Sequence, residues 1–161
     1  MKIVSVVTTA LILTGCASGF SEIVPADKTS KRIFTYDYVV EGASKDVLWT
    51  RARDYFAKSF GDSRSVLRVQ DKESSTLIGK GAESWNLLSN ICASEYDLQF
   101  MSKEGRARLQ LEIIEGVPSY SSCKGWPWPS QSGYETIVSS FGALSSGLET
   151  ALRSNSSFSD F

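Results

Sequence analysis

Apolar and polar side chains alternate along several segments of the chain, a period typical of strands with one buried face. The alternation is clear in residues 32–41, where Phe34, Tyr36, Tyr38 and Val40 fall on one face. The apolar pattern and its flanking turn residues predict further strands at residues 66–70, 76–82, 92–102 and 106–115. The pattern therefore predicts a sheet of about five strands.

The strands at 92–102 and 106–115 have the most sharply defined pairing. Residues 103–106 read Lys-Glu-Gly-Arg, a tight turn with glycine where a positive φ is needed. Pairing Lys103 with Arg106 brings the apolar positions of both strands onto one face. The pairs expected there are Phe100 with Leu109, Leu98 with Leu111 and Tyr96 with Ile113. The same register opposes Asp97 and Glu112 on the other face.

Two glycines mark the strand at 76–82. Gly79 and Gly81 lie on the same face as Leu77. Glycine weakens a strand, so this spacing predicts the close approach of other backbone or of a bulky side chain. Residues 83–91 show no clean period and are expected to pack as a loop or a short helical turn.

Two segments follow the helical period instead. Residues 44–60 begin with Ser44, a suitable N-cap. Their shared apolar face consists of Leu48, Ala52, Tyr55, Phe56 and Phe60. The second helix is expected to begin at a capping box, Ser132 to Glu135, and to run to about Arg153. Its apolar positions are Tyr134, Ile137, Val138, Phe141, Leu144, Leu148 and Leu152.

The order of elements is β-α-β-β-β-β-α, which predicts an α+β domain of two layers. We expect it to span residues 32–153, with a mostly antiparallel sheet covered by both helices on one face. Residues 154–161 are expected to be a flexible tail.

The amino terminus has the pattern of a targeting segment. After Met1-Lys2, residues 3–13 are largely apolar but too few to span a bilayer. Leu13-Thr14-Gly15-Cys16 resembles a bacterial lipobox, in which the cysteine thiol receives a diacylglyceryl group before cleavage. Residues 1–15 are therefore expected to be a signal peptide, and residues 16–31 the lipidated Cys16 and a tether. The alternative is an ordinary secretory signal with a chance cysteine.

A lipidated Cys16 would hold the protein at a membrane without crossing it. Ala17 and Ser18 follow the cysteine, and neither is the aspartate that resembles an inner-membrane retention signal. The sequence therefore predicts a location in the bacterial cell envelope, at the outer membrane and facing the periplasm.

The composition limits which catalytic sites, metal sites and partners the chain can have. The 161 residues include no histidine, which removes Ser-His-Asp and Cys-His catalysis and every histidine-ligated metal site. The formal net charge of −1 gives no basic footprint for nucleic acid. We expect no metal, no cofactor and no nucleic-acid partner.

Several short motifs carry a family resemblance. They are residues 42–49, 52–56, 71–73, 78–81 and 103–106. With this spacing the chain resembles a family of bacterial domains of unknown function described as having a TATA-box-binding-protein-like (TBP-like) fold, over about residues 34–114. The resemblance implies that fold and no established activity. The chain departs from the family at Glu41, where proline is frequent.

Two cysteines remain besides Cys16. In an oxidising compartment an even pair, Cys92 and Cys123, suggests a disulfide that would tie the loop at 117–131 to the sheet. The alternative is two separate thiols. In the same loop, Trp126 and Trp128 each precede a proline. Their indoles either form a preorganised contact patch for a partner or fold over the sheet and complete the core.

Three functions fit these features. The first is a non-catalytic binding module that offers the open sheet face or the Trp loop to an envelope protein or cell-wall partner. The second is an inhibitor lipoprotein whose stapled loop blocks a periplasmic or incoming hydrolase. The third is a hydrolase that uses Asp97 and Glu112 as an acid/base pair, although mixed charge on a sheet face is more often plain solvation. The first is the function we expect, without enzymatic activity.

Overall fold

A computed structural model describes residues 26, 30–60 and 66–154. The elements, in chain order, are β1 (Ile33–Val39), α1 (Lys45–Ser59), β2 (Leu67–Asp71), β3 (Thr76–Leu87), β4 (Asn90–Lys103), β5 (Arg106–Ile113) and α3 (Gln131–Arg153). The expected signal peptide and Cys16 lie outside the described residues. So do most of the tether and all of the expected tail except Ser154.

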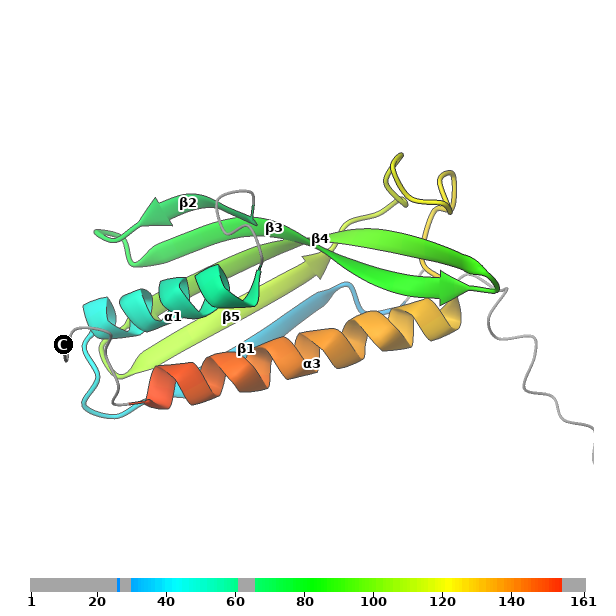
Figure 1. Ribbon diagram of the computed structural model, residues 1–161. Coiled ribbons are helices and arrows are strands. Elements are labelled where there is room, and N and C mark those ends of the chain that lie inside the picture. The colour runs from blue at the N-terminus through cyan, green and yellow to red at the C-terminus, as the bar shows by residue number, and fades with distance from the viewer. Residues whose placement is uncertain (1–25, 27–29, 61–65, 155–161) are drawn as a thin grey trace, which may run out of the picture.

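The strands form one antiparallel sheet in the order β1-β5-β4-β3-β2. Helices α1 and α3 lie against the same face of that sheet, as Figure 1 shows. The α+β two-layer architecture predicted from the alternating and helical patterns is confirmed. Among the described residues, no helix combines the length and apolar character needed to cross a bilayer.

The pairing of β4 with β5 is the one that the sequence predicts. Lys103 faces Arg106, and Leu98 faces Leu111. All six apolar side chains assigned to this face are buried, each at no more than 1% exposure. Gly105 has a φ of 68°, so the turn uses the backbone freedom that only glycine offers cheaply.

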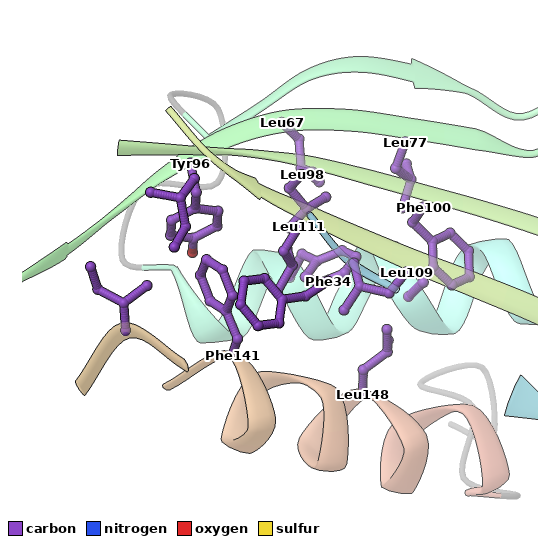
Figure 2. Packing of buried hydrophobic residues seen from close by; sticks show 14 of the residues in the cluster. Phe34, Leu67, Leu77, Tyr96, Leu98, Phe100, Leu109, Leu111, Phe141 and Leu148 are labelled. Carbon is purple, nitrogen blue, oxygen red and sulfur yellow. The ribbon is translucent and has the colours of Figure 1, made fainter. Parts of the chain in front are cut away.

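The core lies between this inner sheet face and the two helices (Figure 2). Phe141 and Leu148 of α3 reach up to the sheet, where Phe34 meets the ring of Phe141 edge-on at 5.4 Å. From α1, Leu48, Ala52 and Phe56 are fully buried. This burial of apolar side chains on facing layers is the main force that holds the two layers together.

Two details of α1 differ from the predicted face. Tyr55 and Phe60 are only partly buried, whereas Trp49 is buried and donates from Nε1 to the carbonyl oxygen of Thr76 at 3.2 Å. Ser44 caps the helix as predicted, accepting a hydrogen bond from the Val47 amide.

Residues 83–87 and 90–91 are strand, so the prediction of a loop or helical turn for this segment is wrong. β3 continues to Leu87 and β4 begins at Asn90, with the chain reversing at Leu88 and Ser89. The alternation was hidden because Glu83 occupies an inward-facing position between Gly81 and Trp85.

The prediction that α3 begins at a capping box on Ser132 is also wrong. Helix α3 begins at Gln131, and its N-cap is Ser130, whose hydroxyl accepts from the Gly133 amide at 3.1 Å. Both serines suit a cap, but this start places Gly133 against the indole of Trp85, where a side chain would clash. Ser132 lies inside the helix instead, where its carbonyl oxygen accepts from the Thr136 hydroxyl at 2.9 Å.

Candidate functional site: the outer face of the sheet

The face of the sheet opposite the helices, which we call the outer face, is the largest candidate site. In the described part of the chain no element covers it (Figure 1). Strand alternation fixes its members: Thr35 and Asp37 of β1, Arg108, Gln110 and Glu112 of β5, Asp97, Gln99 and Met101 of β4, and Ile78 and Lys80 of β3.

Opposite charges pair across neighbouring strands on the outer face. Asp37 faces Arg108, whose Nε and Nη2 donate to its carboxylate at 2.6 and 3.0 Å. This hydrogen bond is the main reason why the pKa of Asp37 lies below its usual value. Nearby, the Lys80 ammonium lies 3.4 Å from Glu95 and 4.0 Å from Asp97.

Asp97 and Glu112 face each other across β4 and β5, as the sequence predicts. Their surroundings differ from those of an acid/base pair in a glycosidase cleft. The Asp97 side chain is 59% exposed and has a lysine beside it. Proton transfer by a carboxyl group usually relies on burial that shifts its pKa towards neutrality. The geometry therefore favours a solvated charge pattern over catalysis.

Apolar side chains are interspersed among these charges. Val69 of β2 lies opposite Ile78 of β3, and both are exposed. Met101 of β4 is also exposed. It lies two positions from Gln99, the β4 partner of Ile78. The outer face thus offers charged pairs and a small apolar strip together, a composition typical of non-obligate protein interfaces.

A disulfide joins Cys92 of β4 to Cys123 of the loop, with the two Cα atoms 5.3 Å apart. The predicted bond is therefore present. Next to it, the Ser121 hydroxyl accepts from the amides of Ala93 and Cys123 at 3.0 and 3.2 Å. The loop is closed at its base, where the Val117 amide donates to the carbonyl of Trp126 at 2.9 Å. It is a fixed structure attached to the end of the sheet.

The two tryptophans of this loop fold inward. Trp128 is 5% exposed, with the Arg32 guanidinium 5.5 Å above its ring. Trp126 is partly buried and meets Trp85 edge-on, with ring centroids 6.4 Å apart. The hypothesis of a Trp contact patch is therefore wrong for Trp128, and the alternative, completion of the core, describes both indoles. Trp126 packs against Trp85 on the inner face of the long β3–β4 hairpin, where Gly133 of α3 also lies against the Trp85 indole.

Sequence reasoning missed a polar group on the inner face. Glu83 is half-buried, and burial raises the pKa of its carboxyl group despite a hydrogen bond with Ser140. Tyr96 is buried beside it, and its hydroxyl has no hydrogen-bond partner among the described residues. The available signal was positional, because Glu83 has the same parity as Leu77, Gly79 and Gly81.

A hollow of about 740 Å³ lies between the β1–α1 connection and the carboxyl end of α3. Arg51 and Arg153 line it, but both guanidinium groups are engaged by the chain itself. Arg51 donates to the carbonyl of Leu152 at 2.7 Å, and Arg153 donates to Glu149. Arg153 is thus paired with a carboxylate, whereas Arg51 keeps its positive charge, and Glu41 also lines the hollow.

The fold and its open face define a class of small α+β domains that expose one side of an antiparallel sheet. The chain belongs to the family described as "Domain of unknown function (DUF4468) with TBP-like fold", whose model matches residues 34–115. This bears out the family resemblance seen in the sequence motifs. None of the curated proteins matches the chain.

Two solved structures share the fold. A DUF4468 family protein from Bacteroides ovatus is similar with a TM-score of 0.58 and 14% identity, over 81% of this chain and 91% of that one. A TBP-like protein from Parabacteroides distasonis is similar with a TM-score of 0.52 and 10% identity, over 78% and 97%. At these identities the likeness concerns the fold alone.

Proposed function

We propose that this chain is a lipid-anchored protein of the bacterial cell envelope and that its domain is a non-catalytic binding module. The observation that supports a binding role is the uncovered outer face, where ordered charge pairs lie next to exposed Ile78 and Met101. The partner would be an envelope protein or a cell-wall component, placed within reach by acylation of Cys16.

The exposed carboxylate of Asp97, with Lys80 beside it, supports a solvated charge pattern here over an acid/base pair with Glu112. Trp128 is not available as a docking residue, because its indole lies in the core. What remains for a partner is the outer face itself, where backbone strands hold side chains at fixed spacing and little ordering is needed on binding.

Site-specific photocrosslinking in intact cells tests the binding face. A photoreactive residue replaces Ile78 on the outer face, and in a matched control it replaces Val47 on α1, which has nearly the same exposure, 40% against 38%. We expect one discrete crosslinked product from position 78 and none from position 47. Crosslinks from position 47 alone, or from neither position, would contradict the proposal.

Acylation is tested separately with a labelled fatty acid. The unaltered chain should incorporate label and fractionate with the outer membrane. Cys16→Ser should abolish incorporation, while Cys92→Ser should not. Label that persists in Cys16→Ser, or an unlabelled parent chain, would contradict the anchor.

A further inference from the structure

The two ends of the sheet differ in charge. At one end, the turns before β3 and between β4 and β5 carry Asp71, Lys72, Glu73, Lys103, Glu104 and Arg106. At the other end, residues 84–94 of the β3–β4 hairpin contain no charged residue. The hairpin extends past β5 at this end, as Figure 1 shows. The uncharged end is therefore the part of the sheet that could leave water without burying a charge.

Exposed apolar side chains are concentrated at the same end. Among the described residues, the three most exposed large hydrophobic side chains are Leu88, Ile91 and Tyr120, at 65, 68 and 66%. Leu88 and Ile91 belong to the hairpin tip, and Tyr120 belongs to the loop that Cys123 ties to β4. None of the three belongs to the core. Tyr120 donates from its hydroxyl to Glu95 of β4 at 3.3 Å, which leaves the apolar side chains of Leu88 and Ile91 at the tip without a structural role in the domain.

The amino-terminal part of the chain approaches this end. The Ala26 amide donates to the carbonyl of Pro129 at 2.8 Å, just before α3 begins. The first turns of α3 and the hairpin tip lie together, because Ser132 and Ile91 line one small hollow. Only about ten residues separate Cys16 from Ala26, so even a fully extended tether reaches about 35 Å.

We infer that the tip of the β3–β4 hairpin, through Leu88 and Ile91, inserts into the interface of the membrane that holds the anchor. This inference rests on the proposed anchor at Cys16. A tether of this length keeps the hairpin tip close to the lipid, and exposed leucine and isoleucine without neighbouring charges partition into the boundary between headgroups and acyl chains. The disulfide and the indoles of Trp85 and Trp126 hold the hairpin rigid.

Insertion would give the domain a defined orientation. β3 and β4 would rise from the membrane, and the charged turns would stand about 40 Å above it, since a strand rises about 3.3 Å per residue. The outer face would then stand upright on the membrane, accessible from the side.

A fluorescence experiment tests the inference without relying on acylation. Residues 16–161 carrying Cys16→Ser are held on vesicles of phosphatidylethanolamine and phosphatidylglycerol by an amino-terminal polyhistidine tag and a nickel-chelating lipid. An environment-sensitive fluorophore is attached to Leu88→Cys or, as the control, to Val39→Cys. Val39 is also exposed but pairs with Arg106 at the charged end.

We expect the label at position 88 to shift to shorter wavelength and to be quenched by spin-labelled lipid, and the label at position 39 to respond as in water. Equal responses at both positions, or none at 88, would overturn the inference. Leu88→Asp with Ile91→Asp should weaken partitioning of the untagged, unacylated chain about tenfold, against no change for Val39→Asp. A change below twofold would also overturn it, whereas failure of fatty-acid labelling at Cys16 would overturn only the anchor.

Discussion

The phenol ring of Tyr96 on β4 lies across Gly81, its direct partner on β3, and fills the space that a methyl group at residue 81 would need. The glycine spacing in β3 predicted such an approach, and Gly79 shows the second kind, because the backbone at Val66 lies against it. Both glycines are thus explained by close approach from the neighbouring strands of the sheet, by a side chain of β4 at Gly81 and by backbone at the start of β2 at Gly79.

Gly81→Ala should therefore lower the free energy of unfolding by about 1–3 kcal/mol, the usual cost of overpacking a core. Urea unfolding followed by circular dichroism measures this change. Gly142→Ala is the matched control, because nothing lies within 4 Å of the added methyl group and alanine favours the helix. Equal effects at the two positions would contradict the packing argument.

Tyr96→Phe should leave the free energy of unfolding unchanged or raise it by up to about 1 kcal/mol, because the buried hydroxyl that it removes has no partner among the described residues. Tyr38→Phe is the contrast. The Tyr38 hydroxyl pairs with that of Ser145 at 2.8 Å, so its loss should cost about 1 kcal/mol. A clear loss of stability in Tyr96→Phe would show that the hydroxyl is satisfied.

Reduction of the disulfide should lower the free energy of unfolding by about 3–4 kcal/mol, since the bond closes a long loop in the unfolded chain. Urea unfolding with and without reductant measures the effect. Cys92→Ser with Cys123→Ser should reproduce it and should no longer respond to reductant. If this variant still responded to reductant, the loss of stability would not come from the bond between Cys92 and Cys123.

Trp128→Ala should destabilise the domain by about 3–5 kcal/mol, as expected for a buried indole. Trp126→Ala should cost less, because that side chain is only partly buried. Thermal unfolding measures both. If Trp128→Ala melted like the parent chain, the indole would not be part of the core.

Glu83→Gln should change the pH dependence of stability. Burial raises the pKa of Glu83 in the folded state, so its favourable contribution exists below the unfolded pKa and is lost as the pH rises through the folded value. The stability of Glu83→Gln relative to the parent should therefore grow between about pH 4 and neutrality. Urea unfolding across this range measures the difference.

Asp37→Asn is the control for that series. The pKa of Asp37 is lowered by its bond with Arg108, so its contribution is present above the unfolded pKa and is lost as the pH falls. The relative stability of Asp37→Asn should thus fall as the pH rises, opposite to Glu83→Gln. Parallel changes in the two variants would contradict the assignment.

The sequence predicted the β4–β5 register because two independent signals agree there, the turn glycine at 105 and the coincidence of apolar positions. It failed at residues 83–91 because an inward glutamate breaks the alternation that identifies a strand. The disulfide followed from cysteine parity. The burial of Trp128 could not follow from sequence, since an indole suits both a core and an interface, and only the packing of the folded chain decides between them.

Helix α3 lies beyond residue 115, where the family model ends, yet Phe141, Leu148 and Leu152 are fully buried against the sheet. All five strands are synthesised before α3, which covers part of the inner face of the sheet. The apolar inner face of β1 and β5 therefore stays uncovered until α3 has been synthesised, and a chain cut before residue 131 would expose it to aggregation.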